Sequence, residues 1–264
     1  MNIVDRGSGV PVVLIPGIQG RWEWMKPGID ALAQQGRVIT FSLADEPSSG
    51  ARFDEDAGFW SYVEQVRDAL DAARIERAAI CGVSYGGLIA GAFAARYPGR
   101  VSSLILVSAL PPSWRPDARV AFHLRFPWLL TPLFCVGSLR LYPEFAAAHD
   151  TCWGGITAAC GAGINVLLHM FHPGRMARRV HLLSSVRIDA ELARVKVPTL
   201  VVTGEERLER VVPPRATQEY LAMWPHAHAE TLARTGHLGL ITRPDEFAAL
   251  VSRFAATHAV RRIA

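Results

Sequence analysis

Two segments of the chain carry side chains that together could perform nucleophilic catalysis. Ser84 lies in the segment GVSYGG, residues 82–87, at the end of the apolar run AAICGV. His237 lies in the glycine-bracketed segment TGHLG, residues 235–239. A serine hydroxyl is a weak nucleophile at neutral pH and needs an adjacent base, most often a histidine oriented by a carboxylate. We therefore predict Ser84 as the nucleophile and His237 as its base, against the alternatives of a packing turn and an ordinary loop histidine.

The glycines around Ser84 favour the catalytic interpretation. A serine in a sharp turn between strand and helix needs neighbours without Cβ, so that the chain can fold tightly and expose the hydroxyl. Gly82 and Gly86 occupy the two flanking positions, and Gly87 would let the helix approach the sheet closely. The bare pattern G-x-S-x-G arises readily by chance, so the inference depends on its placement between a predicted strand and a predicted helix.

A second glycine-rich turn follows the first strong apolar run, VVLI. In the segment PGIQG, residues 16–20, the backbone N–H of Ile18 could point at an oxyanion that develops in the transition state. The N–H of Tyr85, next to the nucleophile, would be the second donor. The alternative is a simple connection between a strand and a helix.

Composition and charge argue against several other functions. The formal net charge is +4, but the arginines are dispersed and form no dense cationic stripe, so we predict no nucleic-acid partner. The densest cluster, with Arg175, Arg178 and Arg179, is interpreted as a solvated helix face. The N-terminus lacks the features of a secretion signal and no apolar run is long enough to span a membrane, so cytoplasmic residence is the default expectation.

The histidines and cysteines predict no metal site and no cofactor. His169 and His172 have the spacing of one helical face, yet no third ligand of suitable spacing is near. The four cysteines show no C-x-x-C spacing and are interpreted as free thiols: Cys81, Cys135, Cys152 and Cys160.

Short β-branched runs alternate with helical patterns, which is typical of a mostly parallel α/β sheet with helices on both faces. The predicted strands are residues 11–15, 37–43, 77–83, 101–109, 198–203 and 228–232, and the predicted helices are 22–35, 59–74, 87–96, 214–223 and 244–257.

Residues 111–192 interrupt the alternation, because they contain no convincing strand. We expect a helical insertion in a core formed by residues 1–110 and 193–264. Its apolar residues could line a substrate pocket or form a small core of their own: Trp114, Phe122, Phe126, Trp128, Leu129, Phe134, Trp153, Met170 and Phe171.

In this order, the segments PGIQG, GVSYGG, the helical insertion, PTLVVTGE and TGHLG resemble the α/β-hydrolase family over about residues 10–257. The resemblance implies a doubly wound sheet and a cap built from the insertion. It also implies Ser84 as nucleophile, His237 as base, and Ile18 and Tyr85 as oxyanion donors. The chain departs from the family in two places: Pro16-Gly17 stands where many members have His-Gly, and the first strands look shortened to about Asn2–Val4.

The family usually places its acid after the strand that here reads PTLVV, and this chain has three glutamates there. Related hydrolases often carry L-D-R-V-V-P, which resembles residues 208–213 with Glu209 in place of the aspartate. Glu209 is therefore the first choice for the acid, and Glu206 the second. Glu205 and Asp117 remain as further candidates, and the unused glutamates would pair with Arg207 and Arg210 in a solvated loop.

Together these features predict a cofactor-free serine hydrolase that cleaves a carboxylic ester of a small to medium, largely apolar substrate through an acyl-enzyme. An aspartate at the elbow would have indicated an epoxide hydrolase or a haloalkane dehalogenase, so the serine argues against both. The alternatives are a lactonase, a carbon–carbon bond hydrolase with the same triad, or a ligand-binding protein of low turnover. The sequence does not indicate an oligomeric state.

Overall fold

The computed structural model describes residues 1–129 and 131–259, except for the side chains of Arg119, His123, Leu133 and Phe134. Seven strands form one sheet in the order β1-β3-β2-β4-β5-β6-β7. β1 pairs antiparallel with β3, and the other neighbours pair parallel, which confirms the predicted mostly parallel sheet. The strands are β1 (Val4–Arg6), β2 (Pro11–Ile15), β3 (Arg37–Thr40), β4 (Ala78–Val83), β5 (Val101–Val107), β6 (Thr199–Thr203) and β7 (Ala227–Thr231).

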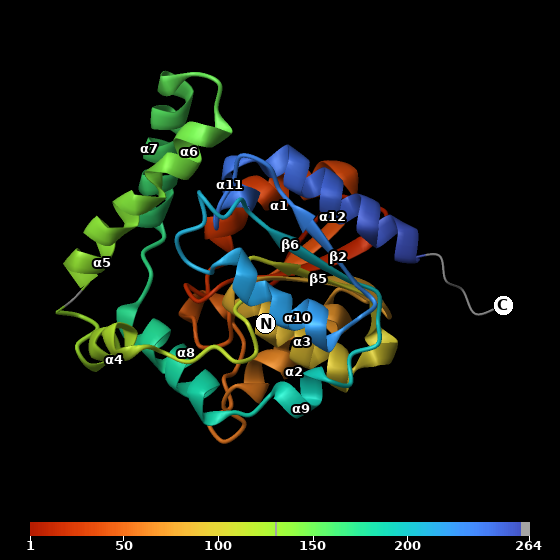
Figure 1. Cartoon of the computed structure of the whole chain (residues 1–264). Coiled ribbons are helices and arrows are strands. Elements are labelled where there is room, and N and C mark those ends of the chain that lie inside the picture. Colours follow the sequence, from red (N-terminus) through yellow and green to blue (C-terminus); the bar gives the residue numbers. More distant parts are fainter. Residues whose placement is uncertain (130, 260–264) are drawn as a thin grey trace.

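Helices cover both faces of the sheet (Figure 1). One face packs against α2 (Trp60–Ala72), α3 (Tyr85–Arg96), α9 (Asp189–Leu192) and α10 (Gln218–Met223). The other packs against α1 (Lys26–Gln35), α11 (Gly239–Thr242) and α12 (Pro244–Ala259). In β2, Val13 and Ile15 belong to the first core, whereas Val12 and Leu14 belong to the second. A strand buried on both faces has to be apolar at every position, which explains the unbroken run VVLI.

Several predicted boundaries were wrong by a few residues. The first strand is β1, Val4–Arg6, because its pairing register with β3 runs from Val4↔Thr40 to Arg6↔Val38. The predicted helix 22–35 is a 3-10 turn, η1 (Trp22–Met25), followed by α1, where Pro27 occupies the first turn. The predicted helix 214–223 likewise divides into η5 (Pro214–Thr217) and α10. Two further 3-10 turns are η2 (Pro47–Ser49) and η3 (Pro98–Arg100).

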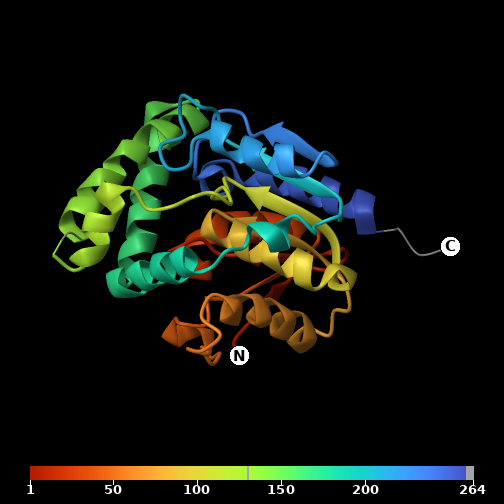
Figure 2. The ribbon, with the colours of Figure 1, turned by 60° about the horizontal axis from the view of Figure 1, so that its bottom comes forward.

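The chain between β5 and β6 is helical wherever it is regular. It contains α4 (Ala118–Arg125), α5 (Thr131–Gly137), η4 (Ser138–Leu141), α6 (Tyr142–Ala148), α7 (Cys152–Leu168), α8 (Pro173–Ser185) and α9. In Figures 1 and 2 the green helices α5, α6 and α7 stand to one side of the sheet and its covering helices. Within the described residues no single helix could cross a membrane by length and composition, although α7 and α8, bent by 90°, pass such a test together.

The apolar residues of this insertion do not form a core of their own. Six of those singled out in the sequence are exposed: Phe122, Phe126, Trp128, Leu129, Trp153 and Met170. Phe171 is buried with its ring against Trp24, and Trp114 packs on the main core. Phe134 lies outside the described side chains. The expectation of a small core was therefore wrong for the six exposed residues, whereas a role in lining a substrate pocket stays a prediction.

Candidate active site

Ser84 occupies a strained turn between β4 and α3. Its backbone has φ 53° and ψ −117°, a conformation that residues with a Cβ rarely adopt. The turn is held by two backbone hydrogen bonds, from Ser84 N–H to the Val107 carbonyl at 2.9 Å and from Gly87 N–H to the Ser84 carbonyl at 2.9 Å. The side chain is only 6% exposed.

The glycines beside Ser84 are required for close backbone contacts, as predicted. A Cβ on Gly82 would lie 2.2 Å from the Gly86 carbonyl oxygen, and one on Gly86 would lie 2.5 Å from the Pro16 carbonyl oxygen. A Cβ on Gly87 would lie 2.4 Å from the Cβ of Ala109, where α3 meets the end of β5. No side chain fits at any of the three positions without displacing its neighbours.

The loops after β6 and β7 also approach each other through glycines. A Cβ on Gly204 would lie 2.5 Å from the Cα of Gly236, and one on Gly236 would lie 2.5 Å from the Leu208 carbonyl oxygen. Glu205 ties the two loops together, because its N–H donates to the Thr235 carbonyl at 2.8 Å and its carboxylate accepts from the Arg234 N–H at 2.7 Å. This contact brings the segment TGEERLE beside TGHLG.

Glu209 is the carboxylate that lies next to His237. Its Oε2 is 3.4 Å from His237 Nδ1, which is ion-pair distance, although the two atoms are not aligned as a hydrogen bond and Nδ1 has no other partner among the described residues. Its Oε1 accepts hydrogen bonds from Val211 N–H at 2.7 Å and Val212 N–H at 3.0 Å. Burial by itself would raise the pKa of Glu209, but His237 and the two amides outweigh it and hold the pKa below its usual value.

The other candidate acids lie elsewhere. Glu205 holds Arg234 N–H and pairs with the Arg207 guanidinium at 2.7 Å. Asp117 caps α4 by accepting from Val120 N–H at 2.7 Å. Glu206 is exposed and makes no hydrogen bond or ion pair in the part of the chain that the structure describes. Of the four, only Glu209 is brought to His237.

Among the described residues, Ser84 Oγ makes no hydrogen bond to the His237 ring. Both residues are mostly covered, with the His237 side chain 11% exposed, and both follow strands of the same parallel sheet at its carboxyl edge. Catalytic hydrogen bonds are commonly long in unliganded proteins and shorten when substrate binds.

Ile18 and Tyr85 lie on the two turns that the sequence predicts to form an oxyanion hole. The turn after β2 is closed by Gly20 N–H on the Gly17 carbonyl at 2.9 Å, and Ile18 N–H donates to no described group. Tyr85 is the first residue of α3, so its N–H has no intrahelical acceptor. The two turns are in contact, since a Cβ on Gly17 would lie 3.5 Å from the Cβ of Ser84.

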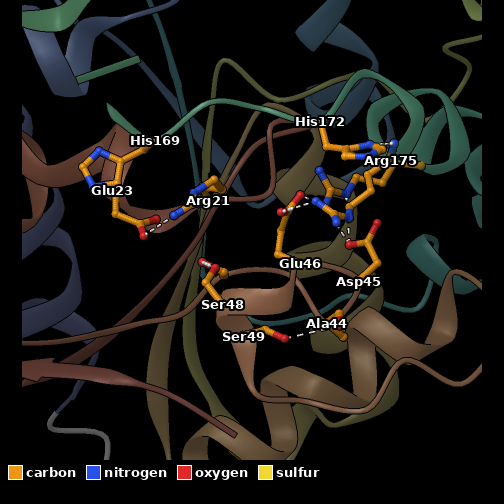
Figure 3. A network of polar contacts seen from close by, with 12 residues as sticks. Arg21, Glu23, Ala44, Asp45, Glu46, Ser48, Ser49, His169, His172 and Arg175 are labelled. Atoms are coloured by element: carbon orange, nitrogen blue, oxygen red, sulfur yellow. Dashed lines mark hydrogen bonds and ion pairs between the residues drawn. The ribbon is translucent and has the colours of Figure 1, made fainter. Parts of the chain in front are cut away.

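A buried ionic cluster beside the oxyanion turn overturns the prediction of a solvated arginine face. The Arg179 side chain, from α8, is fully buried and pairs with Asp45 at 2.7 Å and Glu46 at 2.6 Å. Arg175 binds the other oxygen of Glu46 at 3.1 Å, and Figure 3 shows Arg175 beside Asp45 and Glu46, which lie in the loop after β3. Arg175 and Arg178 are partly exposed, and Arg178 lies over the Phe53 ring and beside Glu55.

Glu144 of α6 was not among the predicted site residues, and it is fully buried. Its carboxylate accepts from Leu238 N–H, with oxygens at 2.9 and 3.0 Å, and from Thr242 Oγ1 at 3.2 Å. Burial raises the pKa of Glu144 above its usual value, and the neighbouring amides and His237 offset part of that rise. The insertion therefore contributes a second carboxylate to the histidine loop. No local sequence pattern marked it.

The remaining candidates have ordinary surroundings. His172 caps α8 by accepting from Arg175 N–H, and His169 Nδ1 contacts Asn165 Oδ1 at 2.9 Å. Among the described residues no group of three or more histidine, cysteine or acidic side chains could hold a metal ion. Cys81 is buried, which raises its thiol pKa, and the other three cysteines are exposed. One surface hollow, of about 450 Å³, is lined by residues such as Met1, Arg52 and Asp68 and includes none of the predicted site residues.

The fold and the placement of Ser84 define a class, and comparison with known proteins agrees. The family described as alpha/beta hydrolase fold matches residues 10–244, so the chain belongs to the α/β-hydrolase family. It is 26% identical over 241 residues to a protein named as a carbamate hydrolase (RutD) from Pseudomonas savastanoi pv. phaseolicola, covering 89% of this chain and 90% of that one.

Two further proteins show the range of this family. The chain is 28% identical over 272 residues to 2-hydroxymuconate semialdehyde hydrolase from Pseudomonas sp. strain CF600, covering 97% of this chain and 90% of the relative. An esterase from Exiguobacterium antarcticum has a similar structure, with a TM-score of 0.78, 18% identity and coverage of 96% of this chain and 94% of the esterase. The relatives support hydrolysis of a small molecule as the activity.

Proposed function

We propose that this protein is a serine hydrolase that cleaves carboxylic esters of small to medium, largely apolar substrates. The observation that carries the proposal is the strained backbone of Ser84, at φ 53°, in a turn that three glycines make possible. Strain of this kind persists only where the surrounding structure maintains it, and it is found at functional residues. The Glu209–His237 pair on the neighbouring loops supports the same role.

In the proposed reaction Ser84 Oγ attacks the ester carbon and passes its proton to His237 Nε2. The charge that forms on the carbonyl oxygen is stabilised by the N–H groups of Ile18 and Tyr85, for which the described residues offer no other acceptor. The tetrahedral intermediate expels the alcohol, which takes the proton from His237. Water then attacks the acyl-enzyme and gives a proton to His237, and the second tetrahedral intermediate releases the carboxylic acid while Ser84 Oγ takes the proton back. Glu209 stabilises the His237 imidazolium during both acylation and deacylation.

Residues 111–192 would act as a cap that supplies the apolar part of the binding site. The insertion holds most of the exposed large apolar side chains of the described chain, including Trp128 and Trp153 at 62% and 76% exposure. Exposed apolar surface of this extent is typical of binding sites. Esters with aromatic or alkyl groups of moderate size should therefore bind better than acetate esters.

A fluorophosphonate probe followed by peptide mapping tests the proposal directly. The folded wild-type protein should be labelled at Ser84 and should hydrolyse p-nitrophenyl esters, whereas Ser84→Ala should lose both label and turnover. Wild-type protein that neither labels at Ser84 nor turns over any ester would refute the serine-hydrolase mechanism. Tight ligand binding with labelling but negligible turnover would instead indicate a receptor-like protein.

Hydrolysis of a carbon–carbon bond is the second candidate. The observation that favours it is the similarity to 2-hydroxymuconate semialdehyde hydrolase over 97% of the chain. The two activities are separated by product analysis on an ester, a lactone and a β-diketone of matched size. Ester cleavage alone supports the first proposal, whereas faster cleavage of the diketone, lost in Ser84→Ala, supports the second.

A further inference from the structure

Arg179 of α8 contacts both residues that we assign to the oxyanion hole. Its Nη1 donates to the Ile18 carbonyl at 2.7 Å, and its backbone carbonyl accepts from the Tyr85 hydroxyl at 3.2 Å. The side chain is fully buried, and so is Tyr85. A residue of the insertion is therefore packed against the two turns that flank the nucleophile.

Gly20 provides the space for this guanidinium. A Cβ on Gly20 would lie 2.4 Å from three atoms of the Arg179 guanidinium, and Gly20 has φ 77°. Either feature alone requires glycine at this position. Gly20, the last residue of the turn PGIQG, therefore leaves room for the Arg179 guanidinium in addition to allowing the tight turn.

Two hydrogen bonds, of which Arg179 donates one, orient the peptide planes on both sides of Ile18. The Gly17 carbonyl is fixed by Gly20 N–H, and the Ile18 carbonyl is fixed by Arg179. Because a peptide unit is planar, fixing the Gly17 carbonyl also fixes the direction of Ile18 N–H, and fixing the next carbonyl prevents the turn from rotating about Ile18. A preorganised donor needs such restraints.

The charges around Arg179 balance. Arg175 and Arg179 face Asp45 and Glu46, so the four groups carry no net charge. A neutral cluster exerts little long-range field on a developing oxyanion, so any effect of Arg179 on the reaction must come from its hydrogen bond to the turn. That distinction makes the role testable by substitution.

We propose that Arg179 is a positioning residue that holds the oxyanion turn, residues 16–20, in its reactive conformation. That conformation would then depend on the packing of α8 against the turn. The proposal rests on the serine-hydrolase function above. Arg179 itself touches neither substrate nor nucleophile in this assignment. Its contribution is the geometry of the Ile18 N–H.

Replacing Arg179 alone would leave Asp45 buried without a counter-charge, because only Glu46 keeps its pair with Arg175, and that variant could fail to fold. The informative variant is therefore Arg179→Met combined with Asp45→Asn, in which Arg175 and Glu46 remain as a pair, so the cluster carries no net charge and has a similar volume. Replacement of buried ionic clusters by uncharged groups is commonly tolerated. The matched control is Arg178→Met, on the same helix, whose side chain is partly exposed and does not contact Ile18.

The combined variant should melt near the wild-type temperature and lower kcat by about 10²-fold with KM changed little, the loss typical of one oxyanion donor. Inhibition by a trifluoromethyl ketone, which mimics the tetrahedral intermediate, should weaken in parallel with kcat, whereas Arg178→Met should behave as wild type. A folded combined variant with wild-type kcat and inhibition would overturn the proposal and leave Arg179 a purely structural residue. Wild-type protein without ester turnover or Ser84 labelling would instead refute the underlying function.

Discussion

Glu209→Gln tests the least conventional member of the proposed triad. The glutamine oxygen can still accept from the Val211 and Val212 amides, so the loop should keep its conformation. Its NH₂ group would then face His237 Nδ1, where the carboxylate Oε2 now lies at 3.4 Å. A donor there favours the tautomer with a bare Nδ1 and a protonated Nε2, which cannot accept the proton of Ser84.

The expected loss follows from the geometry. A unit charge 3.4 Å from the imidazolium contributes about 5 kcal/mol at the effective dielectric constant of about 20 that suits protein sites. This sets an upper limit of roughly 3.5 decades in rate, at about 1.4 kcal/mol per decade. The pair is not aligned as a hydrogen bond, so part of this energy is not realised. We expect kcat to fall by about 10²- to 10³-fold.

The assay is hydrolysis of a p-nitrophenyl ester, with melting temperature measured in parallel. Glu206→Gln is the matched control, because Glu206 lies in the same loop, is exposed and has no described partner; its kcat should stay within about twofold of wild type. Equal small effects of both substitutions would show that Glu209 does not orient His237. A large loss of kcat in Glu206→Gln, without one in Glu209→Gln, would show that Glu206 and not Glu209 is the acid.

Three further substitutions have defined outcomes. Gly204→Ala should lower the free energy of unfolding by about 1–3 kcal/mol in urea titration, because its Cβ would meet Gly236, whereas Gly163→Ala, with open space in α7, should be neutral or stabilising. Ser84→Gly should be about 1 kcal/mol more stable than Ser84→Ala, since only glycine relieves the positive φ; equal stabilities would argue against strain. The raised pKa of Glu144 means that its stabilising contribution is complete below the ordinary glutamate pKa and is lost as pH rises through the folded value, so Glu144→Gln should gain stability relative to wild type as pH rises above the ordinary value of 4.5.

The sharp turn at Ser84 and the contact between Glu209 and His237 were predictable because each depends on neighbours in the sequence. Gly82, Ser84 and Gly86 are within five residues, and their backbone contacts follow from a sharp strand-to-helix turn. Glu209 was chosen by likeness to a short motif, and the same motif supplies the two amides that hold it. The parallel sheet was readable for a similar reason, since strands buried on both faces leave unbroken apolar runs.

Burial of charge was not predictable from local patterns. Arg179 and its partner Asp45 are separated by 134 residues, and the cluster RMARRV looks like the exposed face of any basic helix. Glu144 lies 94 residues from Leu238, in a short helix without an evident amphipathic pattern. Such pairs form only when segments far apart in the sequence meet in the fold. Their two residues have no fixed spacing, so no local pattern identifies them. The exposure of the aromatic residues in the insertion was also not predicted. An apolar composition suggests that side chains are buried, but it does not identify the surface against which they would pack.

The two buried charges place the insertion in contact with both halves of the proposed reaction centre. Through Glu144, α6 holds the backbone of the histidine loop at Leu238; through Arg179, α8 holds the oxyanion turn at Ile18. Each contact buries an ionisable group, which costs free energy unless its partners stay in place. Movement of α6 or α8 away from the core would therefore expose unpaired charge and release a catalytic loop at the same time. An arrangement of this kind links the position of the insertion to the geometry of the proposed base and of the proposed oxyanion hole without requiring any insertion residue to touch the substrate carbonyl.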